Sequence, residues 1–89
     1  MAALVRSTHE HWNGGGYPDG LAGEAIPLCS RIVAVSDAYI AMRESRAYRA
    51  ATPEAVALRE LRRCAGQQFD PQVVNALLVV VSERRAAVA

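Results

Sequence analysis

Apolar residues recur at intervals of three and four along most of the chain, which is the spacing of amphipathic helices. Four segments show this pattern, at about 2–12, 27–42, 52–64 and 70–85. In the first segment Val5, His9 and Trp12 share one face. No segment alternates apolar and polar residues as a half-buried strand would. The pattern therefore predicts an all-α fold of four helices.

The predicted helix starts carry recognisable signals. Thr52 is expected to cap the third helix, with Pro53 in its first position, and Asp70 to cap the fourth, followed by Pro71. The second helix is apolar over most of its circumference, so we expect it to be the most buried element.

Turn-forming residues fill the segment between the first and second helices. Asn-Gly, Tyr-Pro and Asp-Gly pairs surround a run of three glycines at 14–16. Such a run indicates backbone with positive φ, or backbone that passes very close to another group. We therefore predict a long glycine-rich loop over about 13–26.

Composition limits the class of protein. The 89 residues allow one small domain or part of a larger one, and 52% hydrophobic against 21% charged residues excludes a disordered tail. A net charge of +1 offers no general electrostatic attraction for nucleic acid or anionic membrane. No apolar run approaches the length of a membrane span. We expect a cytoplasmic protein with neither a membrane nor a nucleic acid as partner.

Several side chains could carry chemistry, and each also has a structural interpretation. Asp37 is the one charged residue between Arg31 and Arg43, so it either pairs with an arginine or caps backbone, or it is a metal or catalytic carboxylate. His9 is either a core residue or a metal ligand. The arginines at 43, 46 and 49 around Tyr48 are either a solvated stretch or a phosphate clamp.

The run HEHWNGGGYPDGLAGEAIP at 9–27 resembles the signature loop of the HD-GYP domain. The stretches at 31–37, 46–49 and 66–71 resemble later parts of the same domain, in order and with matching gaps. The resemblance implies a helical bundle with a two- or three-metal centre of iron or manganese. In such domains a metal-bridged hydroxide hydrolyses cyclic di-GMP to pGpG or GMP.

Carried over position by position, the resemblance implies His9 and Asp37 as metal ligands. It implies ligand-contacting roles for Tyr17, Arg46 and Arg49. Gly16, Tyr17 and Pro18 match the motif that names the family. No residue of this chain is assigned as catalytic.

The chain also departs from the family pattern. Thr8 stands where the family has a histidine ligand, and the His-Asp pair has no counterpart in residues 1–89. Two matched ligands cannot build a centre that needs roughly six to eight. We therefore expect a partial HD-GYP domain over 1–89, non-catalytic alone, with iron or manganese only in the full domain and none stably bound here.

Two functions remain open on this interpretation. The chain is a helical interaction or nucleotide-binding module, or it is a metal-dependent phosphodiesterase completed by a missing or separate N-terminal half. The apolar second helix leads us to expect a homo-oligomer, with or without exchange of the first segment between copies. A diguanylate cyclase-type domain is a further candidate partner, because the family motif implies it.

Overall fold

The computed structural model describes residues 9–17, 19–45 and 47–88, with side chains as far as Arg84. Within that part the chain forms a short 3₁₀ helix, η2 (Gly23–Ala25), and three α-helices, α2 (Leu28–Arg43), α3 (Glu54–Cys64) and α4 (Pro71–Val88). The described residues contain no strand beyond isolated bridges. The all-α class is thus confirmed, and the three later helices lie within a few residues of their predicted bounds.

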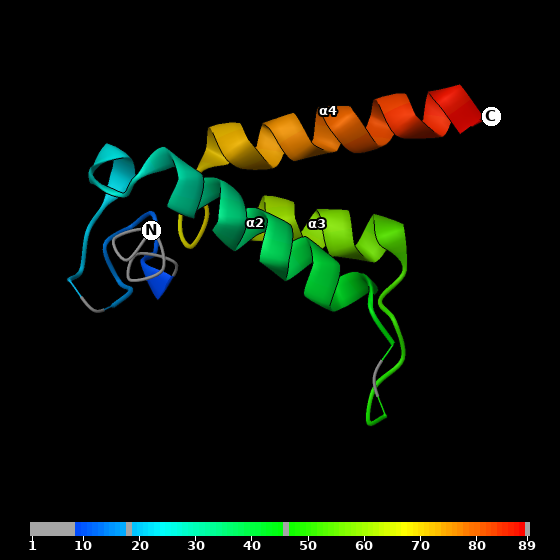
Figure 1. Cartoon of the computed structure of the whole chain (residues 1–89), viewed down its shortest axis with the longest axis horizontal. Helices are drawn as coiled ribbons and strands as arrows, with labels where there is room; N and C mark the ends of the chain where they lie inside the picture. Colours follow the sequence, from blue (N-terminus) through cyan, green and yellow to red (C-terminus); the bar gives the residue numbers. More distant parts are fainter. Residues whose placement is uncertain (1–8, 18, 46, 89) are drawn as a thin grey trace.

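The three helices pack against one another around a small apolar core. Figure 1 shows the N-terminal loop at one end of this bundle, beside the start of α2. The core consists of Val35 from α2, Leu61 from α3, Phe69 from the α3–α4 turn and Val74 from α4. Burial of these side chains is the main apolar contribution to stability.

The C-terminal part of the helix predicted over 2–12 is not helical in the structure. Residues 2–8 lie outside the described part, and the backbone of Glu10–Trp12 is not helical. The reason is that this backbone bonds to another part of the chain. The N–H groups of Trp12 and Asn13 donate to the carbonyl oxygens of Gln68 and Gln67, at 3.0 and 2.8 Å.

Among the described residues the second helix has the smallest share of exposed positions of the three α-helices, as expected, but it is less buried than its apolar circumference predicted. The fully buried residues of α2 are Ser30 and Val35. Leu28, Ile32 and Ile40 are 54%, 45% and 51% exposed. The helix therefore presents an apolar face that the rest of the described chain does not cover.

One of the two predicted caps is found. The Asp70 carboxylate accepts a hydrogen bond from the Gln72 N–H at 2.8 Å, as an N-cap should. At α3, however, Pro53 holds the N-cap position. The prediction for Thr52 is wrong because its backbone is engaged with the end of α2: its N–H donates to Met42 O, and its carbonyl accepts from Arg43.

Arg31 joins the loop to the helices. Its Nε donates to Ile26 O at 2.9 Å, and its guanidinium forms an ion pair with Asp70 at 2.7 Å. The same guanidinium lies 5.9 Å from the centre of a Trp12 ring, a cation–π distance. The loop, α2 and the start of α4 are thereby fixed to one another by a single side chain.

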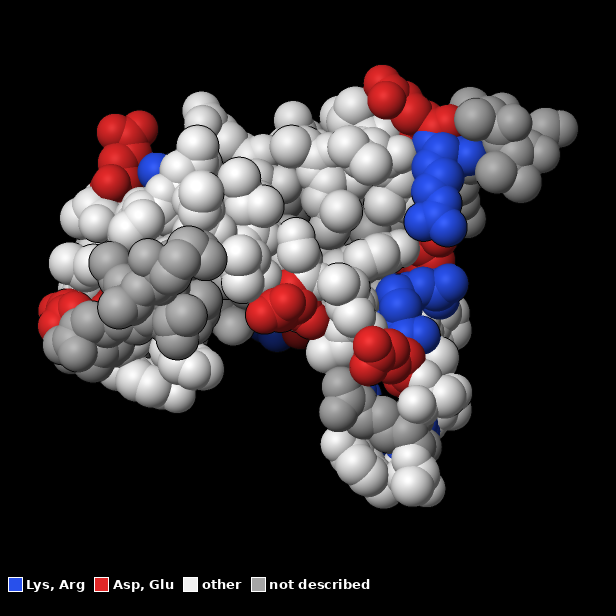
Figure 2. Space-filling model, in the orientation of Figure 1, with Lys and Arg blue, Asp and Glu red and all other residues white. Residues whose placement is uncertain are grey.

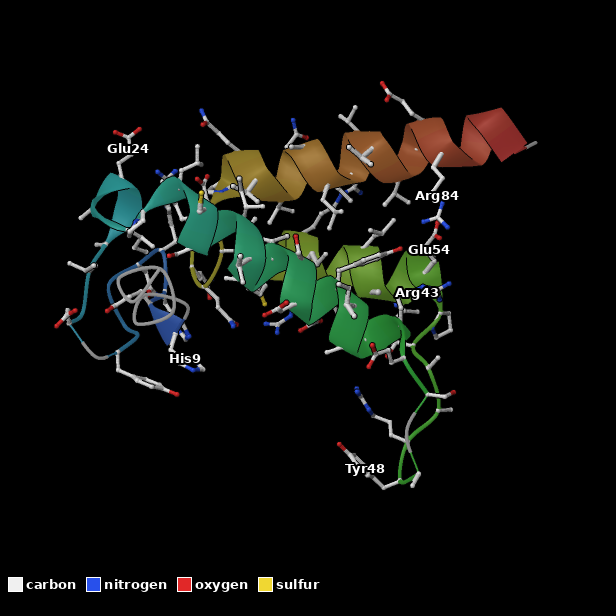
Figure 3. The ribbon with its side chains drawn as sticks, viewed as in Figure 1. His9, Glu24, Arg43, Tyr48, Glu54 and Arg84 are labelled. Atoms are coloured by element: carbon white, nitrogen blue, oxygen red, sulfur yellow. The ribbon has the colours of Figure 1, made fainter. Side chains whose placement is uncertain are left out.

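Charge is unevenly spread over the surface. Figure 2 shows most of the basic side chains in view at one end of the molecule, with a largely uncharged surface between them and the loop. Figure 3 places Arg43, Glu54 and Arg84 at that basic end, remote from His9.

Candidate functional site

The glycine-rich loop is closed at its base by backbone contacts. Asn13 and Ala22 form an isolated antiparallel bridge, and the Gly23 N–H donates to Trp12 O at 2.9 Å. The loop therefore folds back on the residues that precede it.

Glu10 precedes this loop in the sequence, but its side chain lies within it and the residue is 3% exposed. Its carboxylate accepts hydrogen bonds from the N–H groups of Asp19, at 2.9 Å, and Leu21, at 2.8 Å. The sequence analysis gave Glu10 no role. The available signal was an acidic residue immediately before a loop with many unsatisfied backbone N–H groups.

His9 and Tyr17 form a stacked pair. Their ring centroids are 5.0 Å apart and their planes differ by 11°. The Tyr17 N–H also donates to His9 O at 3.2 Å. The core interpretation of His9 is wrong, because the side chain is exposed and stacks on a loop residue instead of facing the bundle core.

Gly16 leaves no room for a side chain. A Cβ at this position would collide with His9 O and His11 N. The loop backbone therefore lies directly on the backbone of residues 9–11. This close approach is one of the two possibilities that the glycine run indicated, and Gly14, with φ of +85°, shows the other.

A pocket of about 360 Å³ lies between the loop, α2 and the α3–α4 turn. It brings together two predicted metal ligands, His9 and Asp37, with the predicted ligand contact Tyr17. Its other lining residues are Glu10, His11, Ala34, Ala38, Gln68 and Phe69. His11 and Gln68 are polar members of this site that the sequence analysis did not assign.

Asp37 is exposed at this pocket, although its apolar helix suggested a buried carboxylate. The difference arises because α3 and α4 pack on another side of α2. Among the described residues Asp37 has no ion-pair or hydrogen-bond partner, so the interpretation of a paired or capping carboxylate is not supported.

The predicted phosphate clamp around Tyr48 does not line this pocket among the described residues. The loop that carries Arg49 and Tyr48 projects from the other end of α2 (Figure 3). Arg49 donates to Ala41 O at 2.9 Å, and Tyr48 is 81% exposed. Arg46 and Pro18 lie outside the described residues.

The donor set of the described residues is too small for a metal centre. No three His, Cys, Asp or Glu side chains within 9–17, 19–45 and 47–88 are grouped to hold an ion. Both oxygens of Glu10 are engaged by backbone N–H groups, which leaves His9, His11 and Asp37, together with the Tyr17 hydroxyl, as the ionisable groups lining the pocket. These residues alone do not fit a binuclear centre, and no reaction step can be derived through one.

The charges that line the pocket also indicate that the site is incomplete in the described residues. The described residues that line it include two carboxylates, two imidazoles and no arginine. A carboxylate repels a phosphodiester unless a cation lies between them. The pocket therefore needs added positive charge before it can hold a phosphate.

The loop that carries His9 and the helix that carries Asp37 both lie within a stretch that matches a known family. The HD domain family matches residues 1–73, and the chain belongs to that family. The HD-GYP resemblance seen in the sequence is confirmed by the curated relatives.

One of these relatives is the cyclic di-GMP phosphodiesterase response regulator RpfG of Xanthomonas campestris, 51% identical over 77 residues. That match covers 86% of this chain and 20% of the relative. A cyclic di-GMP phosphodiesterase of Thermotoga maritima is 39% identical over 82 residues, covering 92% of this chain and 22% of the relative. The chain thus spans about a fifth of the length of these proteins.

A solved structure agrees with this assignment. A cyclic GMP-AMP-specific phosphodiesterase of Vibrio cholerae superposes with a TM-score of 0.81 at 33% identity. The superposition covers 94% of this chain and 19% of that one. Separately, none of the helices in the described part has the length and apolar content needed to cross a bilayer.

Proposed function

We propose that this chain forms one wall of a phosphodiesterase site for cyclic dinucleotides and that it is non-catalytic alone. The wall supplies His9 and Asp37 as two of the metal ligands, and the remaining ligands come from an N-terminal segment or a separate polypeptide. The observation that carries the proposal is the common pocket: the loop and α2 bring His9 and Asp37 to one cavity beside Tyr17.

The substrate class rests on the relatives. Those that match most of this chain are named as phosphodiesterases for cyclic di-GMP or for 3′3′-cGAMP. These nucleotides share a ring of two phosphodiesters, so the proposal extends to both. Tyr17 would contact the nucleotide at the pocket, and Arg49 would do so only if its loop moved toward it. Arg46 lies outside the described residues and is proposed as a further nucleotide contact.

The test uses the chain alone and the chain joined to a donor segment. Alone, with Mn²⁺ or Fe²⁺, it should hydrolyse neither dinucleotide above a metal-free control. Fused behind the segment of RpfG that precedes the region matched by this chain, it should become active, and His9→Ala or Asp37→Ala should each abolish that activity. Glu24→Gln, at an exposed position in η2, is the matched control and should leave it unchanged.

Three results would contradict the proposal. The first is hydrolysis by the isolated chain. The second is a folded fusion that neither binds metal nor hydrolyses either nucleotide. The third is an active fusion that tolerates both substitutions.

The alternative of a helical interaction module is favoured by a separate observation. Leu28, Ile32 and Ile40 leave apolar surface on α2. The same surface is where a second copy, a diguanylate cyclase-type domain or the completing segment would bind. Solution mass distinguishes them: a dimer of the chain alone favours self-association, and a monomer that dimerises with the completing segment favours the proposed site.

A further inference from the structure

Glu10 is a buried carboxylate between two residues of the pocket, yet the proposed site gives it no task. We infer that Glu10 is a positioning residue: it clamps the loop on either side of Gly20 so that the Tyr17 ring stays stacked on the His9 imidazole. The clamp itself stands on the geometry, and its importance for hydrolysis rests on the proposed function.

The carboxylate binds the loop through backbone alone. Its two oxygens accept from Asp19 and Leu21, residues on either side of Gly20. Gly20 has φ of +66°, a conformation that lets the flanking N–H groups turn toward one acceptor. Hydrogen bonds to an ionised acceptor are stronger than neutral ones, and a buried carboxylate requires them.

The clamp acts close to the stacked pair. One backbone hydrogen bond holds Tyr17 to the preceding residues: its N–H donates to His9 O at 3.2 Å. Tyr17 is 62% exposed, so burial does little to fix its ring. The Glu10 contacts begin two residues further on, and they keep the loop on the backbone of residues 9–11, where Gly16 has no space to spare.

The engagement of both oxygens also separates Glu10 from its neighbours in role. His9, Glu10 and His11 all line the pocket, but both oxygens of Glu10 accept from N–H groups of the loop. Glu10 therefore acts on the site through Tyr17 and the orientation of the His9 ring plane, without binding the ligand itself.

The test is NMR on the isolated 89-residue chain, without metal or nucleotide. In the wild type we expect nuclear Overhauser contacts between the Tyr17 and His9 rings, and slow exchange of the Asp19 and Leu21 amides. Glu10→Gln keeps the side-chain length but replaces one of the two acceptor oxygens by an NH₂ group, which cannot accept the N–H that it would face. It should abolish the ring contact and speed exchange of at least one of those amides about tenfold or more, with the helices intact.

Glu60→Gln is the control. Glu60 is likewise a carboxylate that accepts hydrogen bonds, from Arg63, but it lies on α3, away from the loop. It should preserve the Tyr17–His9 contact. A loss of that contact in Glu60→Gln equal to that in Glu10→Gln would reduce Glu10 to a general charge effect and overturn the inference.

Two other results would also overturn it. One is an unchanged ring contact in folded Glu10→Gln. The other requires no variant: Asp19 and Leu21 amides in the wild type that exchange as fast as those of a free loop. Since none of these measurements involves hydrolysis, the inference and the proposed function can fail independently.

Discussion

The helical part of the molecule and its N-terminal loop are held together by different forces. The helices meet through apolar side chains, with Val35, Leu61 and Val74 at their centre. The loop is held by backbone hydrogen bonds, one buried carboxylate and glycines at sites of close approach or positive φ. The site lies where the two meet, so its geometry depends on the part with the smaller apolar contribution.

The largest effect is expected in the helical core. Leu61 is 1% exposed, and Leu61→Ala should destabilise the protein by about 2–5 kcal/mol, the range for a buried leucine. A small domain has little stability in reserve, so much of the chain should unfold. Urea denaturation followed by circular dichroism measures the loss. Val79→Ala, at a position 49% exposed on α4, should change stability by less than about 0.5 kcal/mol.

The connection between the two regions should be nearly as sensitive. Arg31→Met leaves the Asp70 carboxylate, with side-chain exposure of 2%, without its cation, and should cost about 3 kcal/mol. Trp12 fluorescence should change as well, because the guanidinium over its ring is lost. In Arg31→Met/Asp70→Asn the two losses should be less than additive. Strict additivity would show that the ion pair between Arg31 and Asp70 contributes no coupling energy.

Within the loop, Gly16→Ala should have a moderate and local effect. The added methyl group would collide with backbone atoms of His9 and His11, so the loop must shift. We expect a loss of about 1–3 kcal/mol, as for an overpacked site, with the helix content preserved. Gly15→Ala, whose nearest neighbour is the movable Asn13 side chain, should cost less. Equal losses, measured by thermal melting, would contradict the close approach at Gly16.

The smallest effect is expected on the exposed face of α3. The Arg63 guanidinium beside Glu60 holds the pKa of that carboxyl below its ordinary value of 4.5. Because the folded pKa is the lower one, the pair stabilises the fold above about pH 4.5 and ceases to do so as the pH falls through the folded value. Glu60→Gln should slightly flatten the acid side of a plot of melting temperature against pH, and salt should remove the difference. A large or salt-independent change would contradict it.

The same division explains what the sequence could predict. The bounds of α2, α3 and α4 follow from local periodicity and from Pro and Asp signals, because helix formation and capping are local. Thr52 failed as a cap because its backbone is tied to α2, a contact between distant residues.

The structure of the loop could not be predicted from local sequence patterns, because it also depends on contacts between distant residues. Helical spacing at His9 and Trp12 suggested a helix, but tertiary hydrogen bonds to Gln67 and Gln68 determine that backbone. The role of Glu10 depends on N–H groups that only the folded loop presents. The shared pocket of His9 and Asp37 was expected from the family resemblance, and spacing along the chain could not have supplied it.

The most direct test of the central claim is a Mn²⁺ titration of the isotope-labelled chain, read by paramagnetic broadening of its NMR signals. The account predicts weak binding, in the millimolar range, with broadening centred on His9, His11 and Asp37 together and absent from the basic end at Arg84. His9→Ala and Asp37→Ala should each remove this localised broadening. Broadening that leaves either His9 or Asp37 untouched, or tight stoichiometric binding by the chain alone, would contradict the view that these residues form one incomplete wall of a metal site.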